Sequence, residues 1–197
     1  MEPDHPATRR SAPTWVWYGG RPSLDLVNTR RDRECGGVEY LREPADLAGW
    51  LRAAGHGDLA VDAGALAQTR ELREAVDAGV RAAVAGQPFP APALETLNRW
   101  LAAAPVIPPE LRLSGGVAVL RPPEIPRTVA QVLGDIARDA AELLGTSQRS
   151  RLRICPGPGC GGRFTDDSPA GRRRWCSMAV CGNRSKAATH RLAASRS

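Results

Sequence analysis

Four of the five cysteines lie in the last quarter of the chain, in two pairs that share one spacing. The first pair is Cys155 and Cys160, the second pair is Cys176 and Cys181, and fifteen residues separate the pairs. Closely spaced cysteines on two short loops can bring four thiolates to one tetrahedral cation. Sites made only of thiolates favour zinc or iron–sulfur, and nothing else in the sequence indicates redox chemistry. The pattern therefore predicts a structural Zn²⁺ site.

Other uses of the four cysteines stay open at this point. Two disulfides could form in an oxidising compartment, and an iron–sulfur cluster or free thiols would use the same residues. The N-terminal sequence MEPDHPATRRSAP lacks the apolar segment of a signal peptide, so we expect a cytoplasmic protein with reduced thiols. No apolar run approaches the roughly 18 residues that span a bilayer, so we expect no membrane association.

The charge of the chain is unevenly distributed. From Arg149 onward there are eleven Arg and Lys residues against two acids, Asp166 and Asp167. The rest of the chain has sixteen cations and nineteen acids. A cationic tail on a metal module predicts a polyanionic partner, of which DNA is the first candidate. The alternative is a basic surface that serves only solubility.

Hydrophobic periodicity predicts an α+β chain that is mostly helical. We expect an N-terminal arm without fixed structure at 1–14, a helical domain at 15–146 and a zinc finger at 150–197. The expected elements are a strand at 15–18, helices at 22–29, 44–55, 62–85, 94–101 and 126–144, and a β-hairpin from Leu111 to Leu120 around Ser114-Gly115-Gly116.

The finger is expected to have a treble-clef-like order. Phe164 and Trp175 would lie in the two strands of a hairpin that follows the first cysteine pair. A helix over 177–194 would then carry the second pair. A module of this size buries too little surface to fold alone, so zinc would supply the missing stability.

One face of this helix is rich in hydrogen-bond donors and positive charge. Arg and Asn suit the base edges of the major groove, while Lys and His suit phosphates. The expected nucleic-acid contacts are Asn183, Arg184, Lys186, His190 and Arg191, with Arg172, Arg173 and Arg174 just before the helix. Structural alternatives are that Asn183 bridges the zinc loop and that Arg184 offsets the thiolate charge or pairs with Asp166 or Asp167.

Two motifs resemble those of a known family. The segments RRRWCSM and Cys181-Gly182-Asn183-Arg184 resemble the CGNR zinc finger of bacterial proteins, and Leu24-Asp25-Leu26-Val27-Asn28-Thr29 resembles the LDFVNT-like signature of the ABATE domain that precedes it. The resemblance covers nearly the whole chain. It implies a stress-induced transcription regulator with DNA as its partner.

Within the second motif, Asp25, Asn28 and Thr29 are the candidates for a small-molecule pocket. Their more common role would be to satisfy backbone groups at a helix end. The sequence contains no P-loop, dinucleotide motif or HExxH motif, and Cys35 has no neighbouring base, so we expect no enzyme.

We therefore expect a bacterial DNA-binding regulator. Its finger would contact DNA, and its helical domain would sense an effector or assemble copies of the chain, for example as a homodimer. The alternatives are an adaptor whose finger only scaffolds a protein interaction, an RNA-binding protein, and an enzyme whose site the fold assembles from distant residues.

Overall fold

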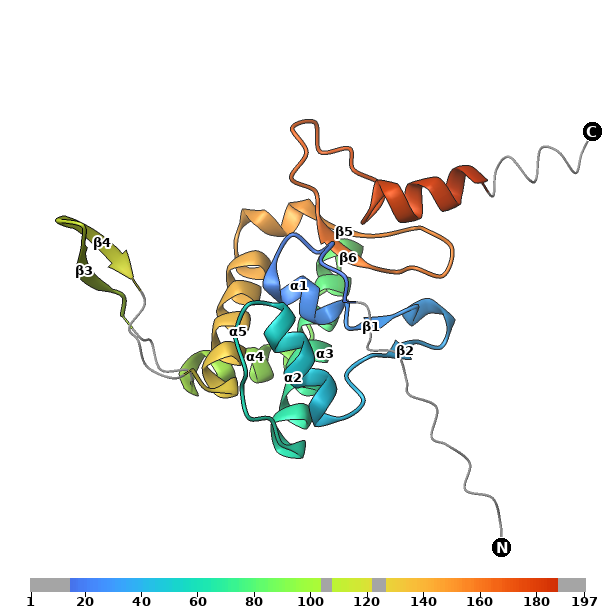
Figure 1. The fold of residues 1–197 in the computed structure, drawn as a ribbon. Coiled ribbons are helices and arrows are strands. Elements are labelled where there is room, and N and C mark those ends of the chain that lie inside the picture. The colour runs from blue at the N-terminus through green and yellow to red at the C-terminus, as the bar shows by residue number, and fades with distance from the viewer. Residues whose placement is uncertain (1–14, 104–107, 122–126, 188–197) are drawn as a thin grey trace, which may run out of the picture.

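The computed structural model describes residues 15–103, 108–121 and 127–187. It confirms a mostly helical chain with small antiparallel strand pairs and a four-cysteine module near the C-terminus (Figure 1). The expected arm at 1–14 lies outside the described residues. The α-helices are α1 (Pro22–Val27), α2 (Pro44–Ala53), α3 (Ala63–Ala85), α4 (Ala91–Ala103) and α5 (Val129–Gly145).

The strands form three two-stranded sheets. These pairs are β1 (Arg30–Arg31) with β2 (Val38–Glu39), β3 (Glu110–Ser114) with β4 (Val117–Arg121), and β5 (Leu152–Ile154) with β6 (Arg163–Thr165). Short helical turns cover Arg33–Cys35, Ser147–Arg151 and Met178–Gly182, and residues 183–187 continue the last of these as an α-helix.

Local signals in the sequence explain where the long helices begin and end. The Asp62 carboxylate accepts a hydrogen bond from the Ala65 N–H at 2.7 Å and caps the start of α3. Gly86 ends that helix with φ +64°, a conformation that glycine adopts without a side-chain clash. At α5, Thr128 and Gln131 form a reciprocal capping box. These caps place both helices close to the ranges expected from periodicity.

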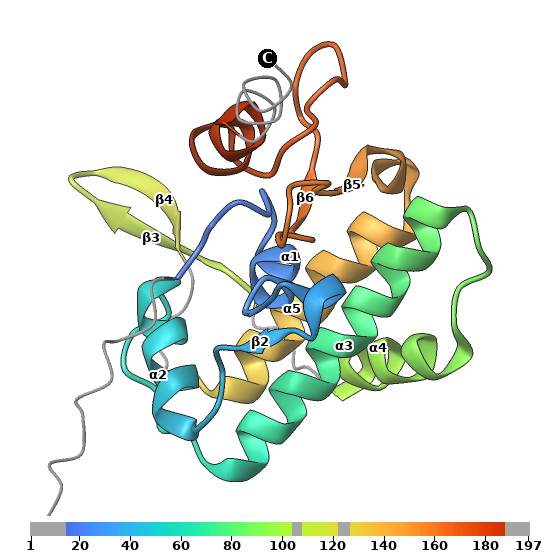
Figure 2. The ribbon, with the colours of Figure 1, turned by 90° about the vertical axis from the view of Figure 1, so that its right-hand side faces the viewer.

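The hydrophobic core lies between α1, α3, α4 and α5 (Figure 2). The apolar stripe expected on α5 is buried throughout, and the apolar residues of α1 are fully buried beside it. This core includes Leu24, Leu26, Val27, Leu72, Val76, Val80, Val132, Leu133, Ile136, Ala140 and Leu143. It also includes Leu152 of β5, so the finger shares its first strand with the core of the helical domain.

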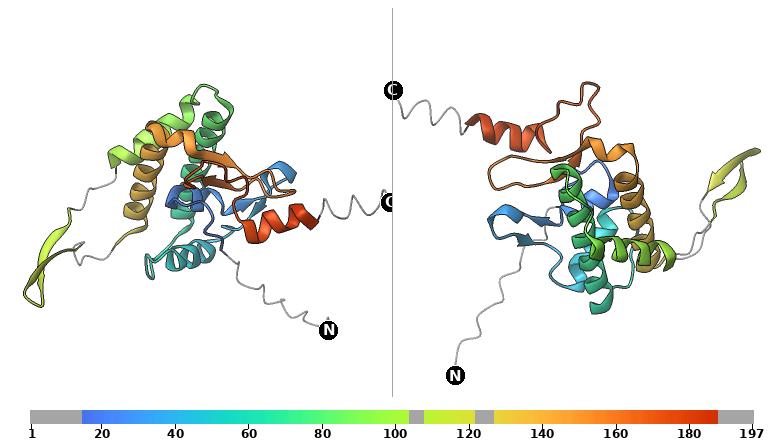
Figure 3. Two further views of the ribbon diagram at one scale, coloured as in Figure 1. Left: turned by 90° about the horizontal axis from the view of Figure 1, so that it is seen from above. Right: turned by 180° about the vertical axis from the view of Figure 1, so that it is seen from behind.

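The β3–β4 hairpin has the expected turn and an exposed apolar face. Gly115 and Gly116 form the turn with φ of +60° and +81°, as a two-residue hairpin requires. In the register of the pair, Leu111 opposes Leu120 and Leu113 opposes Ala118. The three leucines are exposed, and the hairpin stands away from the helices (Figures 1 and 3).

Two strands were expected where the structure has none. Residues 15–18 are irregular, and the Trp17 ring, which is 42% exposed, stacks on Trp50 of α2 at 5.9 Å between centroids. Trp175 lies in a bend rather than in a returning strand. The finger hairpin is β5–β6, and the first cysteine pair lies in the loop between its strands. Phe164 is in a strand as expected, but its partner precedes the cysteines because Leu152 is anchored in the helical core.

Across the described residues, none of the helices combines the length and the hydrophobicity that crossing a bilayer requires.

Candidate metal centre and its junction with the helical domain

The fold brings the four C-terminal cysteines together. Their Sγ atoms all lie within 4.8 Å of one another, with 3.5 Å between Cys160 and Cys176 and 3.6 Å between Cys176 and Cys181. Tetrahedral Zn²⁺ with Zn–S bonds of about 2.3 Å separates its sulfur ligands by about 3.8 Å. The cluster therefore fits a four-coordinate zinc ion. Four protein ligands leave no position for substrate, so the site is structural.

Glycine residues let the loop between β5 and β6 come close to the sulfur atoms. A Cβ atom on Gly157 would lie 3.3 Å from the Cys181 Sγ, and one on Gly162 would lie 3.4 Å from the Sγ atoms of Cys160 and Cys176. The Cys155 N–H donates to the Gly162 carbonyl at 2.8 Å and closes the hairpin beside the cluster. The loop therefore needs small residues at positions 157 and 162 as well as the cysteines.

Four thiolates this close together repel one another, which opposes the ionisation of all four. Hydrogen bonds from Cys160 and Cys176 lower the pKa of the Cys155 thiol. The pKa of Cys176 is raised because its thiol donates to Cys155, and burial raises the pKa of Cys181 to about 12. A divalent cation at the centre would stabilise all four thiolates at neutral pH.

Arg173 lies inside the finger, although the sequence suggested a nucleic-acid contact. Its guanidinium lies over the Phe164 ring at 4.7 Å and donates from Nε to the Trp175 carbonyl at 3.0 Å and from Nη2 to the Cys176 carbonyl. Its backbone N–H donates to the buried Asp166 carboxylate at 3.0 Å. This geometry favours a structural role for Arg173, which fixes the loop that delivers Cys176 to the cluster.

Five of the other seven expected nucleic-acid residues are described, and they divide into two groups. Arg172, Arg174 and Lys186 are exposed on the finger. Arg184 and Asn183 are also exposed, but Arg184 donates to the Pro158 carbonyl at 3.2 Å, and the Asn183 amide donates to the Ala179 carbonyl at 3.1 Å. Arg184 thus connects the segment that follows Cys181 to the loop between Cys155 and Cys160. The remaining two, His190 and Arg191, lie outside the described residues.

Asn28 joins the helical domain to the finger. Its side-chain amide donates to the Arg163 carbonyl at 2.9 Å, and its side-chain oxygen accepts from the Arg163 N–H at 2.9 Å. The amide therefore acts as a neighbouring strand would act toward β6. Asn28 is only 6% exposed, and burying both groups requires that both bonds be made.

The other two pocket candidates also make internal hydrogen bonds. The Asp25 carboxylate accepts from the Gly19 N–H at 2.9 Å. The Thr29 hydroxyl donates to the Leu26 carbonyl at 2.7 Å and accepts from Arg73 at 3.2 Å. These bonds favour the structural role of the motif, at the end of α1 and at the junction.

A buried ion pair crosses the same junction, and sequence reasoning missed it. Arg163 Nε donates to Asp77 Oδ1 at 2.7 Å, and the two side chains are 1% and 3% exposed. Arg33 extends the network, with Nη1 3.4 Å from Asp77 and 2.7 Å from Glu74. A signal was present in the sequence: Asp77 falls on the apolar stripe of α3, one residue after Val76 and three before Val80.

Asp25 is expected to make stability depend on pH. Burial, and to a smaller extent the charge of Asp139, raises the pKa of the Asp25 carboxyl from 3.8 to about 6. The folded state therefore holds this proton more tightly than the unfolded state. The stability that the group contributes is complete below pH 3.8 and is lost as the pH rises through about 6.

Asp25→Asn keeps an acceptor for Gly19 and removes this charge. It is therefore expected to raise the melting temperature more at pH 7.5 than at pH 5, with zinc content checked at both pH values. Asp58→Asn, on a side chain that is 78% exposed, is the matched control and should have little effect. An equal gain from Asp25→Asn at the two pH values would contradict the prediction.

Comparison with protein families agrees with this geometry. A family model named ABATE, described as "Putative stress-induced transcription regulator", matches residues 20–147. A second model, the CGNR zinc finger, matches residues 151–193 and includes the whole sulfur cluster. No curated protein matches the chain. The chain therefore carries a structural zinc ion in its C-terminal finger. Since the first model covers well over half of its length, the chain belongs to the ABATE family and ends in a CGNR zinc finger.

Proposed function

We propose that this protein is a DNA-binding transcription regulator whose zinc finger contacts DNA and whose helical domain senses an effector or assembles copies of the chain. The observation that carries the proposal is the outward-facing positive charge of the finger. In the described part of the finger, the exposed cations are Arg151, Arg172, Arg174, Arg184 and Lys186, and the exposed Arg149 lies just before it. The family description supports a regulatory role of this kind.

The charge balance of the finger favours a polyanion. Zinc with four thiolates carries a net charge of about −2, which the finger's large excess of Arg and Lys outweighs. Arg163 and Arg173 are used inside the fold, as described above. The exposed cations other than Arg184, which bonds to the Pro158 carbonyl, remain available to phosphates, and rigid attachment of the finger to the helical domain keeps them in fixed positions.

Because the surface is small, we expect modest affinity with a strong dependence on salt. Each phosphate contact that is lost should lower the salt slope by about one unit. A homodimer would place two fingers on adjacent half-sites and raise both affinity and specificity.

The test is DNA binding by the full zinc-loaded chain, measured by fluorescence anisotropy over a range of salt concentrations. Replacing Arg172 and Arg174 with alanine is expected to lower affinity about tenfold or more and the salt slope by about two units. The matched control replaces Arg52 and Arg99, which are exposed on α2 and α4 at 63% and 58%. Equal losses in the two double variants would contradict a DNA surface on the finger.

Competition with structured RNA distinguishes the nearest alternative. Duplex DNA should displace labelled DNA more effectively than RNA does. Preference for RNA would overturn the DNA assignment while leaving a nucleic-acid surface. Absence of binding to both would favour a protein-interaction adaptor.

A further inference from the structure

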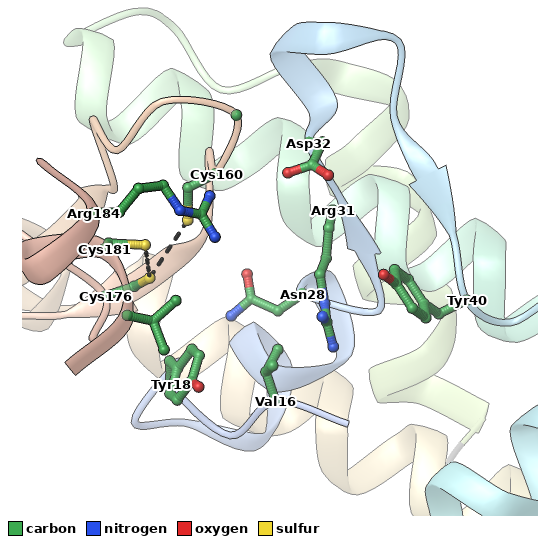
Figure 4. Close-up of a pocket in the computed structure, with 12 residues that line it drawn as sticks. Val16, Tyr18, Asn28, Arg31, Asp32, Tyr40, Cys160, Cys176, Cys181 and Arg184 are labelled. Carbon is green, nitrogen blue, oxygen red and sulfur yellow. Dashed lines mark hydrogen bonds between the residues drawn. The ribbon is translucent and has the colours of Figure 1, made fainter. Parts of the chain in front are cut away.

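A cavity of about 420 Å³ opens where the helical domain meets the finger. Its walls come from both parts of the chain: Tyr18, Arg31, Asp32 and Tyr40 on one side, and Val180 and Arg184 on the other. In Figure 4, Arg31, Asp32 and Tyr40 lie across from Arg184 and the sulfur atoms of Cys160, Cys176 and Cys181. Its size falls within the usual range for small-molecule sites.

Two guanidinium groups line this cavity from opposite walls. Arg31 lies over the Tyr40 ring at 4.3 Å, which holds its planar group in place. Arg184 is held from the finger side by its hydrogen bond to the Pro158 carbonyl, and Figure 4 shows its side chain reaching into the cavity. Positioned guanidinium groups are suited to binding carboxylates through paired hydrogen bonds.

Asp32 adds an unusual backbone to the same wall. Its φ of +52° is the left-handed conformation, and among the described residues no other non-glycine residue has a positive φ. Its carbonyl accepts from the N–H groups of Cys35 and Gly37 at 2.8 and 2.9 Å. Strained backbone of this kind is often kept where it positions a functional side chain.

The total charge around the cavity selects the class of ligand. Arg31 and Arg184 contribute two positive charges, and Asp32 contributes one negative charge. A zinc ion with four thiolates adds about −2 behind the finger wall, so the surroundings as a whole are slightly negative. A dianion such as phosphate would therefore be disfavoured. A molecule with one carboxylate and one cationic group could pair with the guanidinium groups and, at its other end, with the negative charge of Asp32 and the zinc–thiolate cluster.

We propose that this cavity binds a small zwitterion of the amino-acid type. Its carboxylate pairs with the guanidinium groups, its ammonium faces Asp32 and the sulfur-bearing wall, and its side chain packs on Tyr18 and Val180. Because the ligand contacts both parts of the chain, its binding tightens the finger on the helical domain. The regulatory part of this inference rests on the proposed function, since the bound molecule would act as the effector.

The experiment screens the twenty proteinogenic L-amino acids against the full zinc-loaded chain by thermal shift, followed by calorimetry on those that stabilise it. At least one is expected to bind, and benzoate and inorganic phosphate should bind much more weakly. Failure of every amino acid at millimolar concentration would overturn the proposal. So would benzoate or phosphate binding as tightly as the best amino acid.

Matched variants locate the binding site. Arg184→Gln and Arg31→Gln are each expected to lower affinity at least tenfold. Lys186→Gln, on the same exposed helix, and Arg30→Gln, which neighbours Arg31 and pairs with Glu74, should leave it unchanged. Stoichiometric zinc in all four variants shows that the finger is intact. Unchanged affinity in both cavity variants would place the ligand elsewhere.

DNA binding is measured in a separate experiment, so the proposals of ligand binding and of DNA binding can be contradicted independently. If the ligand binds and DNA does not, the proposed amino-acid site is supported and the proposed regulatory role is contradicted. If both bind, saturating ligand is expected to change the affinity for DNA at least threefold, and no change would remove the effector role.

Discussion

Removing the zinc is expected to unfold the finger while the helices remain folded. In the described part of the finger, the core consists of Phe164 and the four clustered cysteines, with Tyr18 and Trp175 partly buried against it, and β5 and β6 are each three residues long. Zinc contributes roughly 10–16 kcal/mol to the folding of small fingers, far more than this core can supply. The helical domain has a large apolar core, formed almost entirely by its own residues, so we expect it to stay folded without the metal.

Cys176→Ser tests this expectation without a chelator. The variant should lose its stoichiometric zinc, and its amide hydrogens between residues 155 and 182 should exchange rapidly, while those of α3 and α5 stay protected. Cys35→Ser removes an exposed thiol outside the cluster and should retain one zinc ion per chain. A Cys176→Ser variant with full zinc content and unchanged protection would contradict a four-sulfur site.

Asp77→Ala is expected to lower the free energy of unfolding by about 3–5 kcal/mol. It leaves the Arg163 guanidinium, which is 1% exposed, without its carboxylate partner in the interior. Since β6 follows the first cysteine pair directly, the variant should also release zinc faster to a chelator. Chemical denaturation and a zinc-release assay measure the two effects.

The matched control is Glu71→Ala on the same helix. Glu71 pairs with Arg99 at 2.6 Å, but both side chains are more than half exposed, so the loss should stay within about 1 kcal/mol. The double variant Asp77→Ala with Arg163→Met removes both charges and should recover part of the stability. If Asp77→Ala were no more harmful than Glu71→Ala, the ion pair would not hold the junction.

Periodicity was enough to predict the long helices, and the two turn glycines were enough to predict the β3–β4 hairpin. The apolar stripe on α5 and the glycines at 115 and 116 each encode their structure locally, within a few residues. The cysteine spacing was equally informative, because thiolates at that spacing have few other uses inside a cell. These features can be predicted without knowing which distant segments of the chain come into contact.

The junction could not be predicted in the same way. The bonds between Asn28 and Arg163 join residues 135 positions apart, and those between Asp77 and Arg163 join residues 86 positions apart. Nothing near Arg163 in the sequence distinguishes it from the exposed arginines of the finger. Arg173 illustrates the same difficulty, since its neighbours Arg172 and Arg174 are exposed while its own guanidinium lies over Phe164.

The attachment of β5 and β6 to the helices limits how this protein can be divided or recombined. A finger fragment that begins at Leu152 would expose this leucine to water, because the helical core that buries it would be missing. Its Arg163 would lose the hydrogen bonds to Asp77 of α3 and to Asn28. Grafting a finger from a relative would therefore require exchanging the residues opposite it as well. In such chimeras, the residues at positions 28, 77 and 163 would have to be inherited as a set.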